Sequence, residues 1–141
     1  MARVDFYVLS ASGEAARQQF ACRLAEKAYK LKNRVHIHVD SADLANRIDD
    51  LLWTFRDGSF VPHEQLGGSV KPSSPVTIGS HELPEFDCDL LINLGETIPE
   101  RADAFPRVAE VVTSDDDSRS RSRQRFVDYR DQGHTLDTHK L

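Results

Sequence analysis

The chain has 141 residues, of which 39% are hydrophobic and 29% are charged, and its formal net charge is −5. These values are typical of one globular domain and exclude a wholly disordered chain. The acidic balance argues against a protein that coats nucleic acid with its whole surface. The chain begins with a predicted strand and no signal-peptide pattern. No apolar run approaches the roughly 20 residues of a membrane-spanning helix. We therefore expect a cytoplasmic protein with no membrane association.

The first half of the chain alternates between strand and helix patterns. β-Branched and aromatic residues predict strands over 4–9 and 35–39. An amphipathic helix is predicted over 14–31, with Ser12 as a candidate N-cap. A second helix is expected to begin after Ser41, whose hydroxyl can cap it. The apolar stripe predicted for the first helix is Ala16, Phe20, Leu24, Ala28 and Leu31.

The second half repeats the alternation after a turn at Asp57-Gly58-Ser59. A flexible connection is expected over 65–75, where glycine, serine and proline are concentrated. Three more strands and a short helix are then predicted, at 76–78, 90–94, 107–112 and 99–105 respectively. The last predicted helix spans 115–132 and ends at Gly133 as a C-terminal glycine.

This order of elements predicts an α/β fold. We expect a single Rossmann-like domain over 1–133, with a mostly parallel sheet of about five strands and helices on both faces. The residues that follow, 134–141, are expected to form a partly flexible C-terminal tail.

The turn after the first predicted strand is where a nucleotide-binding protein of this class would bind phosphate. GxGxxG or GxxxxGK[ST] is expected there, because backbone amides must approach the phosphates closely. Residues 10–14 read Ser-Ala-Ser-Gly-Glu, with one glycine and no lysine. Glu14 would repel a phosphate from the helix N-terminus. No cofactor is therefore expected, and a small Rossmann-like nucleotide-binding enzyme is the alternative function.

Patterns for catalysis and metal binding are weak. There is no GxSxG nucleophile motif, and Cys22 and Cys88 are far apart and fit no CxxC pattern. His36 and His38 share one face of a predicted strand, either as metal ligands or as packed histidines. Packing is favoured because nothing else nearby has ligand spacing. The acids at 115–117 are those that a helix N-terminus prefers. We expect no catalytic constellation and no metal site.

An aromatic cluster surrounds the end of the second predicted helix. Trp53 is the only tryptophan, with Phe60 just beyond the turn. It lies on the face of the second predicted helix opposite that helix's apolar stripe, which comprises Leu44, Ile48, Leu51 and Leu52. A large aromatic on the solvent face is either covered by the following loop or offered to a partner. The pattern leaves both interpretations open, and this segment is the first place to look for a docking surface.

Arginine side chains and one aromatic ring share a stripe of the last predicted helix. At about 100° per residue, the members of this stripe are Arg119, Arg123, Phe126 and Arg130. Arg125 points elsewhere and can pair with Asp128 or Asp131. A solvated arginine face is the commoner case, but an aromatic ring in its middle is not expected there. Such a stripe suits an acidic peptide, or phosphates with the ring stacked on a base. The negative net charge favours the peptide.

Several segments of the sequence resemble, in the same order, the chi subunit of bacterial DNA polymerase III holoenzyme. They are 4–9, 51–63, 75–78, 89–94 and 123–133. The most diagnostic part is Leu-Trp followed by Ser-Phe-Val-Pro-His within 51–63. The resemblance implies a non-enzymatic adaptor with a Rossmann-like core. It would link the clamp loader, through the psi subunit, to single-stranded-DNA-binding protein and so indirectly to DNA.

The resemblance also implies two binding surfaces. One would hold the acidic C-terminal tail of single-stranded-DNA-binding protein, which ends in proline and phenylalanine. Arg119 and Arg123 would meet the tail's carboxylates, and helical geometry adds Arg130. The apolar pocket would be formed by Val112, Phe126, Gly133 and Leu136. The surface for psi would be formed by Trp53, Phe60 and Pro62. Val127 stands where the family often has a basic residue.

Overall fold

The computed structural model describes residues 2–58, 60–66, 73–81, 83–84 and 87–141. Within these residues, seven strands form one sheet in the order β3-β4-β2-β5-β6-β1-β7, and all neighbouring strands are parallel. The elements in chain order are β1 (Arg3–Val8), α1 (Glu14–Lys30), β2 (Val35–His38), α2 (Ala42–Thr54), β3 (His63–Gln65), β4 (Val76–Gly79), β5 (Leu90–Asn93), the 3₁₀ helix η1 (Ala102–Ala104), β6 (Arg107–Val112), α3 (Asp116–Asp131) and β7 (Thr135–Lys140).

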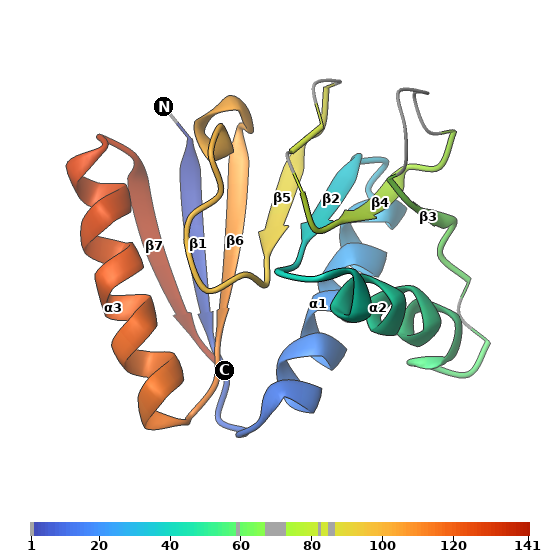
Figure 1. The fold of residues 1–141 in the computed structure, drawn as a ribbon, viewed down its shortest axis with the longest axis horizontal. Helices are drawn as coiled ribbons and strands as arrows, with labels where there is room; N and C mark the ends of the chain where they lie inside the picture. The colour runs from blue at the N-terminus through green and yellow to red at the C-terminus, as the bar shows by residue number, and fades with distance from the viewer. Residues whose placement is uncertain (1, 59, 67–72, 82, 85–86) are drawn as a thin grey trace.

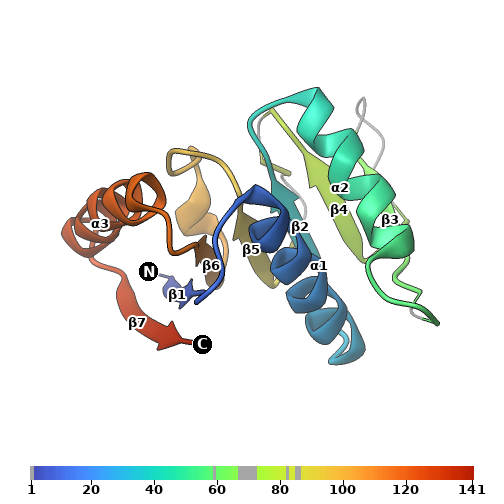
Figure 2. The ribbon, with the colours of Figure 1, turned by 90° about the horizontal axis from the view of Figure 1, so that it is seen from below.

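Helices cover both faces of the sheet, as the alternating pattern predicts (Figures 1 and 2). Helices α1 and α2 pack on one face, in a core that includes Cys22, Ile48 and Ile92. Helix α3 packs on the other face, in a core that includes Phe6 and Tyr129. Successive residues of a strand point to opposite faces, so the central strands contribute to both cores. The α/β class and the parallel sheet are confirmed.

The first helix differs from the prediction in its cap and in its buried side. Gly13, with φ 92°, is the N-cap, and no side chain caps the helix, so Ser12 does not serve as the cap. The buried residues of α1 are Gln18, Ala21, Cys22, Ala25, Glu26 and Ala28. Small residues face the middle of the sheet, while Phe20 packs beside Tyr7 of β1 with ring centroids 5.3 Å apart. Leu31, predicted in the stripe, is 67% exposed.

The second helix begins as predicted. The Leu44 N–H donates to Ser41 Oγ over 3.2 Å, which satisfies one of the unpaired donors of the first turn. Its buried residues are Ala45, Ile48 and Leu52. Trp53 therefore lies on the outer side, as the helical spacing indicates.

Two edge strands, β3 and β7, account for the difference between about five predicted strands and the seven in the described residues. Strand β7 pairs with β1 along its whole length, so the sheet continues past Gly133, and residues 135–140 belong to the domain. The sequence signal was weak because an edge strand has one neighbour and carries polar side chains. The connection predicted over 65–75 includes residues 67–72, which lie outside the described residues, and Ser59 of the predicted turn does too.

Gly133 ends α3 as predicted and directs the chain into β7. Its φ is 88°, a conformation that glycine adopts without a Cβ clash. The Gly133 N–H donates to the Arg130 carbonyl over 3.0 Å, and the His134 N–H donates to the Tyr129 carbonyl over 3.2 Å. These two bonds form a Schellman motif, which reverses the chain and brings β7 alongside β1.

A buried polar network fastens α3 to the sheet. Glu110 of β6 is fully buried and accepts hydrogen bonds from Arg125 Nε over 2.9 Å, Tyr129 Oη over 2.7 Å and Asn93 Nδ2 over 2.8 Å. Burial raises the pKa of Glu110, whereas the Arg125 charge and the three hydrogen bonds oppose the rise. The network joins β5, β6 and α3, which fixes the rotation of α3 on the sheet.

Arg125 is thus buried, and its predicted pairing with Asp128 or Asp131 is wrong. Its Nη1 also donates to the Glu96 carbonyl over 3.0 Å. Helical spacing correctly places Arg125 on a different side of α3 from the arginine stripe. It cannot predict that this side faces a buried carboxylate on β6, a strand elsewhere in the chain. The tertiary packing of α3 on β6 decides the partner.

Replacing one partner of this network should destabilise the protein strongly. We expect Arg125→Met to lower the free energy of unfolding by about 3–5 kcal/mol, because the Glu110 carboxylate loses its buried counter-charge. Tyr129→Phe should cost about 1.5–3 kcal/mol, since it removes one hydrogen bond to a charged group. Urea denaturation measures both changes.

Arg121→Met is the matched control on the same helix. Arg121 pairs with Glu96 over 3.2 Å, but both side chains are more than half exposed. Its loss should cost less than about 1 kcal/mol. Equal effects of Arg125→Met and Arg121→Met would contradict the role assigned to the buried network.

Candidate functional site

An apolar groove lies between α3 and the part of the sheet next to the β7 edge. Its volume is about 390 Å³. It is lined by Phe6 and Val8 of β1, Val112 of β6, Thr138 of β7, and Ser122, Arg123, Phe126 and Val127 of α3. Among these described lining residues none carries a carboxylate, and Arg123 provides the only formal charge.

Strand register and helical spacing bring these side chains together. Phe6 is paired with Thr138, and Val8 is paired with Val112, so neighbouring strands present side chains to the same face at this level. Phe126 packs against Phe6 with ring centroids 5.4 Å apart. Arg123 lies about one helical turn before Phe126 and is exposed. The groove thus combines an apolar floor with a guanidinium group at its rim.

The structure brings three of the predicted site residues into this groove, namely Val112, Arg123 and Phe126. Arg119 is exposed one turn before Arg123 on the same helix. Arg130 is exposed farther along α3, where its Nη2 lies 3.5 Å from Asp131 Oδ1. Because β1 and β7 are parallel and α3 runs back along them, Arg130 lies toward the opposite end of the groove from Arg119.

Gly133 and Leu136 lie beyond the C-terminal end of α3 and outside the groove lining. Gly133 terminates the helix. Leu136 is partly buried and packs against the core beneath α3, paired in register with Val4. Gly133 and Leu136 therefore affect the groove indirectly: they set the path of the chain from α3 into β7, whose Thr138 lines the groove.

The sequence reasoning missed Phe6, Val8, Ser122 and Thr138 as groove residues. Phe6 and Val8 were assigned to a strand, but the face of that strand that α3 covers was not predicted. Thr138 lies within 134–141, a segment whose position at the chain end predicts a partly flexible tail rather than a strand. The alternation of Leu136 and Thr138 with Asp137 and His139 was the available signal for an edge strand.

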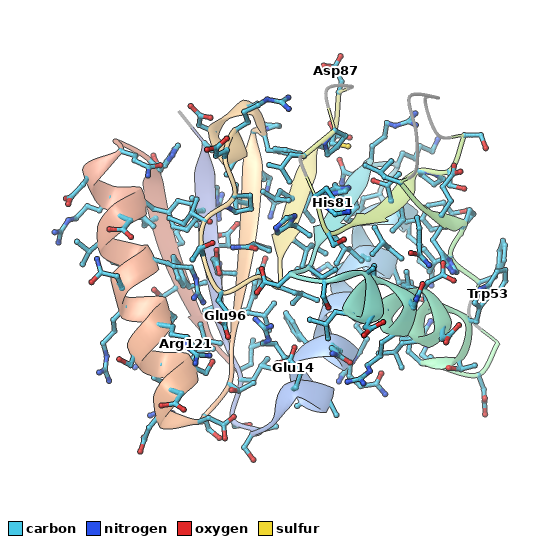
Figure 3. The ribbon with its side chains drawn as sticks, in the orientation of Figure 1. Glu14, Trp53, His81, Asp87, Glu96 and Arg121 are labelled. Carbon is cyan, nitrogen blue, oxygen red and sulfur yellow. The ribbon has the colours of Figure 1, made fainter. Side chains whose placement is uncertain are left out.

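A second surface lies near the other edge of the sheet, at the end of α2. Trp53 is 56% exposed and Phe60 is 62% exposed, and Figure 3 shows Trp53 projecting outward from this end of the molecule. The ring centroids of Trp53 and Phe60 are 5.6 Å apart, and those of Trp53 and His63 are 4.8 Å apart. Pro62, which lies between Phe60 and His63 in the sequence, is partly buried. The following loop therefore supports Trp53 without covering it.

The phosphate position after β1 is occupied by the protein's own carboxylate. Asp115 Oδ2 accepts hydrogen bonds from the Gly13 N–H over 2.8 Å and from Thr113 Oγ1 over 2.7 Å. These donors lower the pKa of Asp115, so the group stays ionised. Glu14 pairs with Arg17 over 2.9 Å at the same end of α1. Asp115 and Glu14 together make this end of the sheet unfavourable for a phosphate.

The two histidines of β2 differ in burial, because His38 is only partly buried. His36 is fully buried, and its Nδ1 lies 2.8 Å from Thr77 Oγ1. Burial, followed by the neighbouring His38, lowers the pKa of His36 to about 3, so its ring is neutral. Among the residues that the structure describes, no group of three or more histidine, cysteine, aspartate or glutamate side chains is arranged to hold a metal ion.

The two cysteines are buried thiols. Burial raises the pKa of Cys22 to about 12, and it raises the pKa of Cys88 to about 11. A thiol with a raised pKa is a poor nucleophile and a poor metal ligand, because both roles need the thiolate. Separately, none of the helices in the described parts of the chain has the length and apolar character needed to cross a membrane.

A family model described as "DNA polymerase III chi subunit, HolC" matches residues 1–137. DNA polymerase III subunit chi of Pseudomonas aeruginosa is 40% identical over 100% of this chain and 98% of its own length. The chi subunit of Haemophilus influenzae is 31% identical over 97% of this chain and 96% of its own. That of Escherichia coli K12 is 30% identical over 98% and 97%.

Among solved structures, the crystal structure of T4 UvsW is similar with a TM-score of 0.66 over 99% of this chain and 41% of that one. At 9% sequence identity, this likeness concerns the fold alone. The family match and the relatives agree over nearly the whole chain. The chain therefore belongs to the DNA polymerase III chi subunit family, with an accessory role in DNA replication.

Proposed function

We propose that this chain is a non-catalytic adaptor of the DNA polymerase III clamp-loader assembly. It joins that assembly, through the psi subunit, to the acidic C-terminal tail of single-stranded-DNA-binding protein. The observation that carries the proposal is the groove beside α3, where Arg123 borders an apolar floor that contains no carboxylate among its described residues.

The chemistry of the groove matches that of the tail. A terminal phenylalanine and the proline before it bury their apolar surface against Val8, Val112 and Phe126. Arg123 pairs with the terminal carboxylate or with an aspartate of the tail, through charge-assisted hydrogen bonds. Arg119, one turn away and exposed, attracts the remaining aspartates. Arg130 serves the same purpose from the other end of α3.

The groove favours a peptide over single-stranded nucleic acid. A nucleic-acid groove needs several cations along the backbone and aromatic rings with open faces. Phe126 is only partly exposed and packs against Phe6, and the chain as a whole carries a net charge of −5. DNA is therefore reached indirectly, through single-stranded-DNA-binding protein.

The exposed rings of Trp53 and Phe60, with Pro62, form the proposed surface for psi. Two adjoining large apolar side chains that are more than half exposed are typical of a protein–protein contact. The His63 ring is fixed by the contact between its Nδ1 and the Val61 carbonyl, which are 2.6 Å apart. This fixed ring packs edge-on against Trp53 and so supports it. The surface is therefore preorganised for a partner.

Charge reversal in the groove should abolish binding of the acidic tail. We expect Arg123→Glu to weaken binding of a peptide with aspartates before a terminal Pro-Phe by at least about thirtyfold. The guanidinium would be replaced by a carboxylate that repels the ligand. Isothermal titration calorimetry measures the change.

Arg121→Glu is the matched control, because it makes the same change in net charge on the opposite side of α3. It should leave the affinity within about threefold of the wild type, since Arg121 is not among the described residues that line the groove. An unchanged affinity of Arg123→Glu would remove the groove as the peptide site.

Truncation of the aromatic surface should separate the two partners. Trp53→Ala and Phe60→Ala are each expected to weaken binding of the psi subunit by about 2–4 kcal/mol and to leave peptide affinity unchanged. Pull-down with psi and calorimetry with the peptide give the two readouts. Leu31→Ala, at an apolar side chain that is also exposed, is the control. Retention of psi by both aromatic variants would show that its surface lies elsewhere.

Nucleotides should not stabilise the protein. A ligand that binds only the native state raises the midpoint of thermal unfolding. We expect ATP and NAD to produce no shift, because the Gly13 amide already donates to Asp115. A clear shift with either nucleotide would favour the alternative of a small nucleotide-binding enzyme.

A further inference from the structure

Strand β7 is one wall of the groove, and its two faces have different environments. Leu136 and Thr138 are paired with Val4 and Phe6 and face α3. Asp137 and His139 are paired with Asp5 and Tyr7 and face the opposite side of the sheet. Among the described strands β7 has one neighbour, β1, so its register depends on few contacts.

Two side-chain contacts on that opposite side join β7 to β1. His139 Nε2 donates to Asp5 Oδ1 over 2.9 Å. Arg3 Nη2 lies 3.3 Å from Asp137 Oδ2. Both contacts are diagonal and are offset in the same direction. His139 lies two residues beyond Asp137, which is the register partner of Asp5, and Asp137 lies two residues beyond Thr135, which is the register partner of Arg3. Only one register of β7 satisfies both pairs.

The histidine contact is the stronger of the two. The Asp5 side chain is 2% exposed, whereas Arg3 and Asp137 are both about half exposed. Burial raises the pKa of Asp5, but the hydrogen bond from His139 and the nearby Arg3 and Arg107 outweigh burial, so the pKa is lowered. The His139 ring also stacks on Tyr7, with centroids 5.0 Å apart and planes 19° apart.

We propose that the His139–Asp5 contact positions β7 for ligand binding in the groove on the other face of the sheet. It holds the register that presents Thr138 to the groove and Leu136 to the core beneath α3. A slip of one residue would exchange the two faces of the strand and remove this wall. The proposal rests on the proposed function only for the choice of ligand.

The test uses His139→Leu, which removes the donor, and His139→Gln, whose amide can still donate to Asp5. Hydrogen exchange of the Thr135–Lys140 amides and calorimetry with the acidic Pro-Phe peptide are both measured on the full chain. In His139→Leu, we expect exchange in β7 to accelerate and peptide binding to weaken, each about two- to tenfold, with α1 amides unchanged. His139→Gln should restore most of the protection of the β7 amides and most of the peptide affinity.

His81→Leu is the matched control, because His81 is exposed and lies away from β7 (Figure 3). The proposal is overturned if His139→Leu leaves either β7 exchange or peptide affinity unchanged, or if His139→Gln is as damaging as His139→Leu. If the wild-type protein does not bind the peptide, the proposed ligand is wrong. Faster exchange confined to β7 would then still support the positioning contact, and unchanged exchange would overturn it.

Discussion

The hydrogen-bonded network around the buried carboxylate of Glu110 is the interaction on which the position of α3 and of the groove beside it depends. Helix α3 is rich in charged residues and offers few apolar side chains to the sheet, so hydrophobic burial alone holds it weakly. Glu110 supplies a specific partner for Arg125 and Tyr129, and Asn93 completes the network. With Arg125 turned inward, the spacing of the helix leaves Arg119 and Arg123 on the outside, beside the groove.

The two candidate surfaces lie toward opposite edges of one sheet. The groove is built on α3 and the β7 side, whereas Trp53 belongs to α2 near the other edge strand, β3 (Figures 1 and 3). Phe60 lies between α2 and β3 in the chain. A continuous parallel sheet separates them, so ligands at the two places do not compete for the same atoms. This arrangement supports the proposed adaptor, which has to hold two partners at once.

The α/β fold of this chain does not by itself imply nucleotide binding. In this chain the loop after β1 donates its Gly13 amide to Asp115, where a phosphate would otherwise be accepted. The same fold therefore serves as a rigid frame. Its proposed binding surfaces lie along the outer side of α3 and at the end of α2, both away from the loop after β1.

The sequence alone determined what depends on neighbours along the chain. It predicted the alternation of strands and helices, the Ser41 cap, the Gly133 terminus, the outward position of Trp53 and the stripe of Arg119, Arg123, Phe126 and Arg130. Periodicity reports which side of its own element a residue occupies, and cap and turn chemistry acts over a few residues.

Only the tertiary structure decided which elements meet. It paired β7 with β1, placed Thr138 beside Phe6 in the groove, and gave Arg125 its partner Glu110. These contacts join segments that are far apart in the sequence, and the polar pattern of an edge strand resembles that of a loop. Their partners are set by packing across the sheet, which no local pattern records.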